Sequence, residues 1–388
     1  MWSISIDMGN MPKHNFKISK PISDGSLQFD IDVFSSAIIP SLKNEAYATP
    51  NTSSQFTHTI KSIRHSSTLD TFYQQAFGQL DSLDMSLSAY TKAVDEIQGG
   101  GHLLASSEIL NTQKRMLNEF SILPMNNALT PITSITTGLT TALNAGSKMT
   151  LINNMDNANI KGLLNIGYLN TKNGLLNLNS GYLGGALGAD IAFGGFSLFG
   201  AINLAFAQNA YSGKIMDNAL NGNYTDILLH TQAGMRYNIA LSNTISFSPL
   251  TYLSLSHLYT KAFNEKSLVF AKSFGDNGQN ILGGNIGAVF ALRLPNKFSL
   301  DIYSVYEHIL NTKQISANAQ FLDFADSHFA IYKPLSKYAL RSGLAICAGA
   351  ISYSKLSVGI FHEITKNTNS IGTQVQFVWK FGEGKGRE

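Results

Sequence analysis

The sequence is short of charge and of long apolar runs. Asp, Glu, Lys and Arg make up 14% of its 388 residues, whereas about a quarter is usual in soluble domains. Its apolar runs, such as residues 183–187, are short and broken by glycine, whereas a transmembrane helix needs about 18 or more apolar residues. The mean hydropathy is only +0.01. This composition excludes helical membrane spans and favours a closed β-barrel, in which side chains alternate between lipid and lumen.

Other absences exclude whole classes of function. The single cysteine, Cys347, rules out a disulfide framework and a zinc cluster. A net charge of +3 is too small to indicate a nucleic-acid partner. The motifs Gly-x-Ser-x-Gly and His-Glu-x-x-His and the Walker loop are missing. We therefore expect no enzyme activity, no cofactor and no metal, and we interpret the glycine-rich residues 181–188 as easing strand curvature or close packing, not as a dinucleotide loop.

The amino-terminal region carries no readable motif. Residues 1–20 are polar and lack the apolar core of a signal peptide. Because an outer-membrane protein must first cross the inner membrane, we expect the chain to be the carboxyl-terminal part of a longer precursor. Residues 1–67, rich in Ser, Asn and Thr, are predicted to be irregular.

Two helices are predicted between residues 68 and 120. Over residues 68–98 the apolar side chains recur at spacings of three and four, which is typical of an amphipathic helix. Gly99, Gly100 and Gly101 end this pattern. Residues 102–120 give a second, weaker helical pattern, which Pro124 and Pro131 bound.

From residue 159 onward the apolar side chains recur with period two. Each segment places apolar residues on one face and polar residues on the other, as a strand with one face in lipid and one in a polar lumen would. About ten strands are readable, near residues 160–168, 181–191, 196–206, 227–237, 245–255, 282–292, 298–306, 338–346, 356–360 and 371–381.

Connection lengths alternate between short and long. The short ones are at residues 193–195, 240–243, 294–297 and 350–352, and the long ones are at 172–178, 209–223, 260–280 and 311–336. Short turns on one side and long loops on the other are typical of outer-membrane barrels, and an even strand number would place both ends of the barrel on the periplasmic side. A soluble all-β barrel or sandwich, with its apolar side chains inside, is the alternative, but so few charges make a poor soluble β surface.

Several segments resemble one known family in their order and spacing. These are Ala93-Val94-Asp95-Glu96-Ile97 with the helix that follows, Phe247-Ser248-Pro249-Leu250 with Tyr252-Leu253-Ser254-Leu255, Ala262-Phe263-Asn264-Glu265, and Val305-Tyr306-Glu307-His308. Over about residues 93–381 the chain is similar to the translocator domain of autotransporters, the type V secretion proteins. It has Gln98-Gly99-Gly100 where that family usually shows Ser-Gly-Glu.

The resemblance implies an outer-membrane, up-and-down antiparallel β-barrel of twelve strands with a helix through the pore. Residues 128–154 would then supply the hairpin that is missing from the ten readable strands. The implied organisation is a passenger remnant or stalk at 1–67, a helical linker and pore helix at 68–130, the barrel at 131–381 and a tail at 382–388. The passenger would be exported through the pore to the cell surface. A porin-like outer-membrane channel and a soluble β-rich binding protein are the competing interpretations.

The resemblance also implies partners. They are outer-membrane lipid and lipopolysaccharide, the barrel assembly machinery with periplasmic chaperones, and the chain's own passenger.

Candidate functional residues follow from the strand parity. Eight charged side chains would point into the lumen, either holding the pore helix as a plug or simply lining a solvated pore: Lys161, Arg236, Arg293, Asp301, Glu307, Arg341, Lys355 and Glu363. Aromatic residues near the periplasmic rim, where aromatics anchor at the interface, would form the assembly signal: Phe377, Trp379 and Phe381. Two Asn pairs are candidate positions of linker cleavage: Asn126-Asn127 and Asn153-Asn154.

Overall fold

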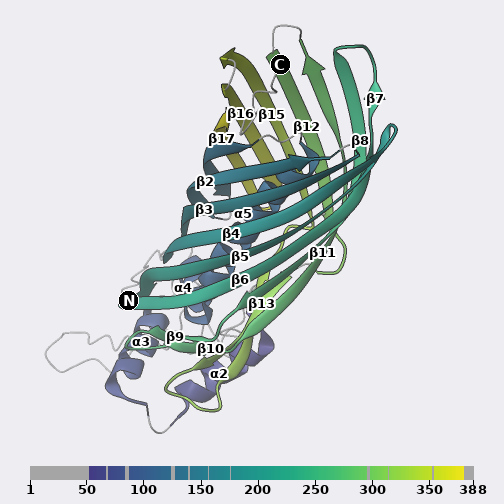
Figure 1. Ribbon diagram of the computed structural model, residues 1–388. Helices are drawn as coiled ribbons and strands as arrows, with labels where there is room; N and C mark the ends of the chain where they lie inside the picture. The colour runs from purple at the N-terminus through teal and green to yellow at the C-terminus, as the bar shows by residue number, and fades with distance from the viewer. Residues whose placement is uncertain are drawn as a thin grey trace, which may run out of the picture.

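The wall of the molecule is a closed antiparallel β-barrel of twelve strands (Figure 1). The computed structural model describes residues 52–66, 69–83, 87–123, 127–138, 140–155, 157–174, 176–294, 298–312, 314–351 and 354–379. The wall strands are β1 (Ala128–Gly138), β2 (Thr141–Asn154), β3 (Ala158–Asn173), β4 (Leu176–Phe193), β5 (Phe196–Ile215), β6 (Asn218–Tyr237), β8 (Ile245–Thr260), β11 (Asn277–Arg293), β12 (Phe298–Ile309), β15 (Tyr338–Ile351), β16 (Ser354–Thr365) and β17 (Thr368–Trp379). β1 pairs with both β2 and β17, which closes the ring.

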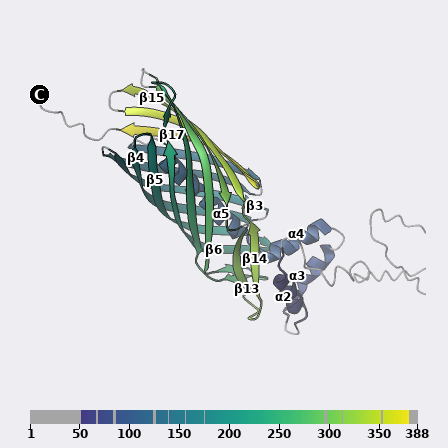
Figure 2. The same ribbon diagram turned by 90° about the vertical axis from the view of Figure 1, so that its right-hand side faces the viewer.

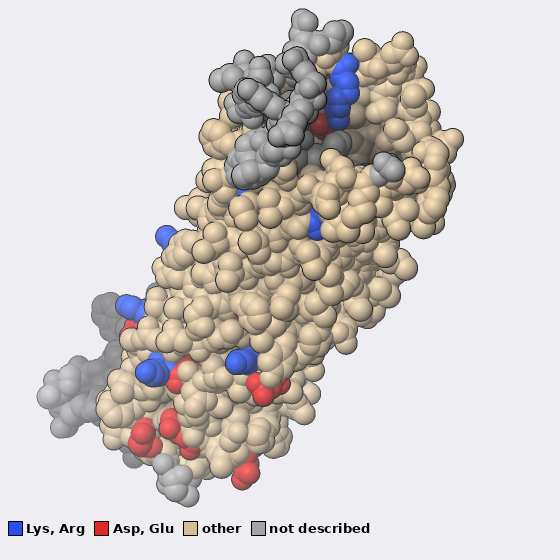
Figure 3. Space-filling view, in the orientation of Figure 1, with Lys and Arg blue, Asp and Glu red and all other residues tan. Residues whose placement is uncertain are grey.

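The outer face of the wall is apolar and its inner face is polar. On β3, Ile160, Leu164 and Ile166 are 48%, 55% and 61% exposed, whereas Lys161 and Asn165 between them are buried. In a soluble protein this alternation would point the other way. The middle of the wall accordingly shows few charged side chains, and most of them gather toward its lower end (Figure 3). The outward apolar face confirms the predicted membrane barrel.

The two ends of the barrel differ. One, here named the short-turn end, carries tight connections such as the turn between β4 and β5, and the short strand β7 (Ile239–Ala240) lies there. The other, named the long-loop end, carries the connections that contain β9 (Phe263–Lys266), β10 (Lys272–Phe274), β13 (Gln314–Phe321) and β14 (His328–Pro334). These four strands pair in the order β9-β10-β13-β14.

Three helices pack on these loop strands. They are α2 (Ser54–Arg64), α3 (Thr71–Ser82) and α4 (Leu87–Gln98), and we name them with β9, β10, β13 and β14 the cap. Ser53 and Asp70 cap the first two helices by accepting hydrogen bonds from the backbone amides of Phe56 and Tyr73. The cap has an apolar core, in which Phe56 packs edge-on against Phe329 with ring centroids 5.2 Å apart, and the same cluster continues into the helix that follows α4 and into the long-loop end of the wall.

A fourth helix, α5 (Gly101–Ile122), runs through the inside of the barrel (Figures 1 and 2). Of its 22 residues, 20 are buried, and only Ser107 and Asn111 are partly accessible. No described helix combines the length and apolar content needed to cross a membrane.

The structure corrects several predictions. Residues 54–64, expected to be irregular, form α2, because Phe56, Ile60 and Ile63 bury one helical face in the cap. The single helix expected over residues 68–98 is two helices, α3 and α4. The barrel begins at Ala128 and not at residue 131, and the hairpin β1–β2 occupies residues 128–154 as the family resemblance implied.

Two of the four long connections predicted from the sequence were also wrong. The expected loops at residues 172–178 and 209–223 are hairpins, in which strand pairing continues to Asn173 with Leu176 and to Ile215 with Asn218. Their polar residues belong to strand ends that continue past the apolar band of the wall, so the period-two signal is lost there while the backbone pairing goes on. The long connections at 260–280 and 311–336 are confirmed, although both contain short strands.

Candidate functional site

The candidate site is the lumen with α5 inside it. The helix begins after Gly99 and Gly100, whose positive φ angles of 81° and 91° break the preceding helix α4. At its amino-terminal turn the backbone oxygen of His102 accepts a hydrogen bond of 2.9 Å from the hydroxyl of Tyr224 on β6. The amino end of α5 therefore lies at the long-loop end, and its carboxyl end lies toward the short-turn end.

Two cations meet the carboxyl end of α5. Lys161 Nζ lies 3.4 Å from the backbone oxygen of Phe120, and Arg236 Nη1 lies 3.2 Å from that of Ile122. The last carbonyl groups of a helix have no partner within the helix and carry its negative dipole end, so cations are favourable there. Asp190 balances both cations, at 2.5 Å from Lys161 and 3.3 Å from Arg236.

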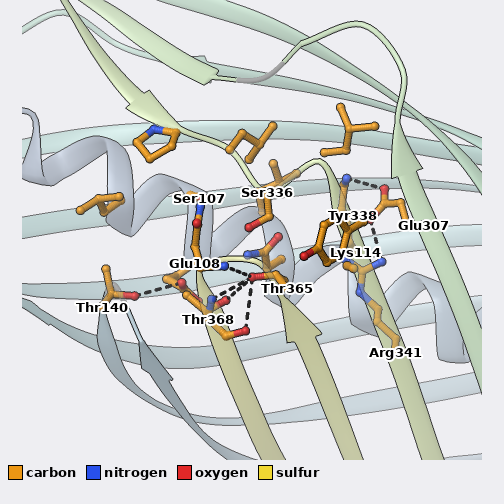
Figure 4. Close-up of a pocket in the computed structure, with 18 residues that line it drawn as sticks. Ser107, Glu108, Lys114, Thr140, Glu307, Ser336, Tyr338, Arg341, Thr365 and Thr368 are labelled. Carbon is orange, nitrogen blue, oxygen red and sulfur yellow. Dashed lines mark hydrogen bonds and ion pairs between the residues drawn. The ribbon is translucent and has the colours of Figure 1, made fainter. Parts of the chain in front are cut away.

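A chain of buried ion pairs joins the middle of α5 to three neighbouring strands. Glu307 on β12 lies between Lys114 Nζ of α5, at 2.7 Å, and Arg341 Nη1 of β15, at 2.8 Å. Arg341 Nε also bonds Glu363 on β16 at 2.6 Å. None of these four side chains is more than 3% exposed. Figure 4 shows Lys114 and Arg341 on either side of Glu307.

A second ion pair fixes the carboxyl-terminal half of the helix. Glu119 Oε2 lies 2.6 Å from Lys148 Nζ of β2. Its other carboxylate oxygen accepts a hydrogen bond of 3.0 Å from the hydroxyl of Tyr303 on β12. Since β2 and β12 lie on different sides of the ring, Glu119 ties α5 to the wall in two directions.

Further polar contacts extend along the rest of α5. Ser106 donates to Asp226 at 2.7 Å, and the Gln113 amide bonds Asn165 at 3.1 Å. Glu108 accepts a hydrogen bond of 3.1 Å from Thr140 (Figure 4). A buried polar or charged group without a partner is costly, so these pairings favour one position of the helix over neighbouring ones.

Little free space remains between α5 and the wall at this level. The cavity beside Glu108 and Lys114 has a volume of about 40 Å³. Such a volume holds one or a few water molecules. A larger cavity of about 820 Å³ lies at the long-loop end, beside the junction of α4 and α5.

Comparison with known proteins assigns the family. A family model described as "Autotransporter beta-domain" matches residues 135–359, which is more than half of the chain. The chain belongs to the autotransporter beta-domain family. It is a translocator domain of the outer membrane, as the resemblance implied. No curated protein matches the chain.

Three solved autotransporter structures are similar to this chain. The translocator domain of the autotransporter NalP from Neisseria meningitidis is 15% identical, and the aligned part covers 74% of this chain and 99% of that one with a TM-score of 0.58. The transport unit of AIDA-I from Escherichia coli is 13% identical, with coverages of 69% and 97% and a TM-score of 0.48. The beta domain of the Bordetella autotransporter BrkA is 12% identical, with coverages of 66% and 100% and a TM-score of 0.44. The similarity to NalP is one of fold.

The predicted lumen residues of the translocator fall into three groups. Lys161, Arg236 and Glu307 contact α5 directly, and Arg341 and Glu363 join it through Glu307. Arg293 and Asp301 pair with each other at 2.5 Å near the short-turn end, where the Arg293 side chain is 43% exposed. The side chain of Lys355 lies outside the described residues.

Of the other predicted positions, those that the structure describes lie at the short-turn end of the translocator. Phe377 faces outward and is 51% exposed, whereas the side chain of Trp379 and all of Phe381 lie outside the described residues. Asn153 and Asn154 lie within β2 and not in the linker, so a cut between them would break the wall. Asn126 is outside the described residues, and Asn127 precedes β1, where its side chain accepts a hydrogen bond from the amide of Ile152.

Sequence reasoning missed several charged residues that hold α5 in the lumen. Lys148 lies in the hairpin that was not readable, and Asp190 stands in a glycine-rich segment. Lys114 and Glu119 lie on a helix whose charges were not assigned. The available signal was the charge on α5 itself, since a helix placed inside a pore needs a wall partner for each ionised side chain.

Proposed function

We propose that this translocator exports the chain that precedes α5 through its own lumen and then anchors it at the cell surface. The observation that carries the proposal is the path of the chain in Figure 2: α5 lies in the lumen, and the residues before it emerge at the long-loop end. Outer-membrane barrels keep short turns in the periplasm and long loops outside, which supports an outward orientation for the cap.

In this proposal α5 becomes a plug after export. Lys114 and Glu119 hold it to the wall by ion pairs, and Lys161 and Arg236 meet its carboxyl end. Polar contacts suit an element that must enter a hydrated pore, because each bond to water can be exchanged for a bond to the wall. We therefore favour the holding role over a solvated pore lining for the lumen charges.

The partners follow from the same proposal. The apolar band of the wall contacts lipid and, in the outer leaflet, lipopolysaccharide. The barrel assembly machinery and periplasmic chaperones would receive the unfolded barrel, with Phe377, Trp379 and Phe381 as the assembly signal. The Asn126-Asn127 pair, between α5 and β1, stays a candidate for cleavage.

The test is surface labelling of intact cells that carry an epitope tag before residue 52. We expect the tag to bind antibody and to be removed by added protease. A second tag in the turn at Gly194 and Gly195, at the short-turn end, serves as the matched control and should react only after the outer membrane is permeabilised. An amino-terminal tag that needs the same permeabilisation would contradict the proposal.

A further inference from the structure

The large cavity at the long-loop end has the size of a small-molecule site. Its volume is about 820 Å³, and it lies beside the junction of α4 and α5. The first turn of α5, the turn between β3 and β4, the ends of β5 and β6, and β14 bound it. Pockets for small molecules have volumes of about 300–1,000 Å³. The lining therefore indicates which kind of molecule would fit.

Part of the cavity lining is apolar. Leu104 of α5, Leu176 of β4, Ile215 of β5 and Leu220 of β6 contribute to it. Leu104, Ile215 and Leu220 are buried, and Leu176 is half-buried. Because these side chains come from four elements, they form a continuous apolar surface where the elements meet. Such a surface stabilises the apolar part of a ligand by removing it from water.

The lining also contains cations without a close counter-charge. Lys333 of β14 and Lys214 of β5 line the cavity, and no described carboxylate lies within 4.0 Å of either ammonium group. Burial lowers the pKa of Lys333 below its ordinary value of 10.5, although the charge of Asp95 acts in the opposite direction. A buried cation with an incomplete counter-charge is costly, so an anion beside Lys333 would be stabilised.

The amino end of α5 adds to this positive region. Its cap residue is Gly100, which makes no side-chain cap bond, so the first amides of the helix have no partner within it. Anions are favourable at such an end. His102 in this turn also lines the cavity and is 2% exposed, and no described residue makes a hydrogen bond with its ring nitrogens. An imidazole carries an N–H donor in either charge state, and a ligand anion would give that donor a partner.

Two of the three acids on the lining already have a cation. Glu265 lies 2.8 Å from Lys272, and Glu96 lies 3.9 Å from Lys92. One further acid, Asp95, then stands against two lysines and the positive end of α5. This charge balance favours an anion over a cation in the cavity.

The positive and apolar regions lie next to each other. A Cβ on Gly100 would lie 2.9 Å from Cε of Lys333, and one on Gly101 would lie 2.1 Å from Cδ1 of Leu176. We propose that this cavity binds a small organic anion with an apolar tail. The anionic group lies between Lys333 and the first turn of α5, and the tail lies against the apolar part of the lining. This site is separate from the proposed export.

The experiment is titration calorimetry on the full chain in lipid nanodiscs, with nanodiscs that lack the protein as the blank. The probes are octanoate, octylammonium and octanol, which share one tail and differ in the charge of the head group. At neutral pH octanoate should bind about tenfold more tightly than octylammonium, because bonds to charged groups contribute that much. Octanoate that gives no heat beyond the blank, or binds no more tightly than octylammonium, would overturn the proposal.

Lys333→Met locates the anionic group. Methionine keeps an apolar stem beside Gly100 and removes the charge, so octanoate should bind about tenfold more weakly and octanol with unchanged affinity. Lys172→Met is the matched control, because Lys172 is exposed on β3 at the same end and is not part of the cavity lining. It should change neither affinity.

Two results with these variants would contradict the proposed position. One is octanoate binding that is as tight in Lys333→Met as in Lys172→Met. The other is an equal loss of octanoate and octanol affinity in Lys333→Met, which is the result of a merely structural role. The comparison of head groups in the natural chain does not depend on how the variants fold.

Discussion

The helix in the lumen and the helices of the cap differ in the part that buried charges play. Besides apolar contacts such as Phe120 with Leu163, α5 meets the wall through buried ion pairs, such as Lys114 with Glu307 and Glu119 with Lys148. The cap helices meet the loop strands through apolar contacts, such as Phe56 with Phe329. The two regions join at Gly99 and Gly100.

This difference fits the different surroundings of the two regions. Polar contacts can be exchanged with water one at a time, so a helix held by them can enter a wet pore and still end in one register. Apolar burial gains its free energy only when the surfaces meet, which suits helices that form their core after they have left the pore. The contrast predicts that charge changes act on the lumen and cavity-forming changes act on the cap.

Arg341→Ala should give the largest effect. It removes the Arg341 ion pairs of the buried Glu307 and Glu363 and leaves Glu307 paired with Lys114, and breaking a buried ion pair in this way costs about 3–5 kcal/mol. The free energy of unfolding by urea in lipid vesicles measures the loss. A loss below about 1 kcal/mol, the contribution of a surface ion pair, would mean that the buried ion pairs of Arg341 stabilise the protein no more than exposed ion pairs do.

Ile60→Ala tests the cap. The side chain is fully buried in the cap core, and truncating a buried isoleucine costs about 2–5 kcal/mol. Hydrogen exchange should rise in α2, α3 and α4 while the protection of the wall strands is unchanged. Equal acceleration in the wall would show that the two regions unfold together.

Much of the wall could be predicted from the sequence, because apolar and polar residues alternate where one face of a strand contacts lipid. In the hairpin β1–β2 this alternation is weakened by Pro131, Gly138 and several threonines, so the hairpin was predicted only from the family resemblance. The continued strands of β5 and β6 were not predicted because their ends no longer lie in lipid.

The site was less predictable than the wall. Parity placed Glu307 and Arg341 in the lumen, but their partners come from far along the chain, as Lys114 and Glu307 show at a separation of 193 residues. Helix over residues 68–98 and the two long connections could be predicted, but their assembly into the cap could not, because these helices and loop strands share a core only after the barrel brings the loops together.

Tyr73→Phe should give a smaller, pH-dependent effect on the cap. The Tyr73 hydroxyl donates to Asp323 at 2.8 Å and accepts from the amide of Phe270 at 3.0 Å, and losing such a buried group costs about 1–3 kcal/mol. Burial, with the bond to Asp323, raises the pKa of Tyr73 above its ordinary value of 10.0.

The sign of the pH effect follows from that shift. A raised pKa means that folding favours the neutral hydroxyl, so its contribution is complete below pH 10 and is lost as the pH rises beyond it. Hydrogen exchange of α3 should therefore accelerate above pH 10 in the natural chain and less in Tyr73→Phe. If exchange of α3 accelerated equally in the natural chain and in Tyr73→Phe, ionisation of Tyr73 would not be the cause of the pH effect.

Arg293→Ala should give the smallest effect and is the control for Arg341→Ala. The Arg293 side chain is 43% exposed in its pair with Asp301, and such pairs contribute about 0–1 kcal/mol. Urea unfolding under the same conditions should show that small loss. If Arg293→Ala lowered the free energy of unfolding as much as Arg341→Ala, the buried ion pairs of the lumen would not differ in strength from this exposed pair.

The most direct measurement of the central claim is conductance across a planar lipid bilayer. If α5 fills the lumen, the intact protein should stay closed, and a chain that lacks residues 95–120 should open with a large, steady conductance. Steady conductance of the intact protein, equal to that of the deletion, would contradict the plugged translocator and point to a porin-like channel.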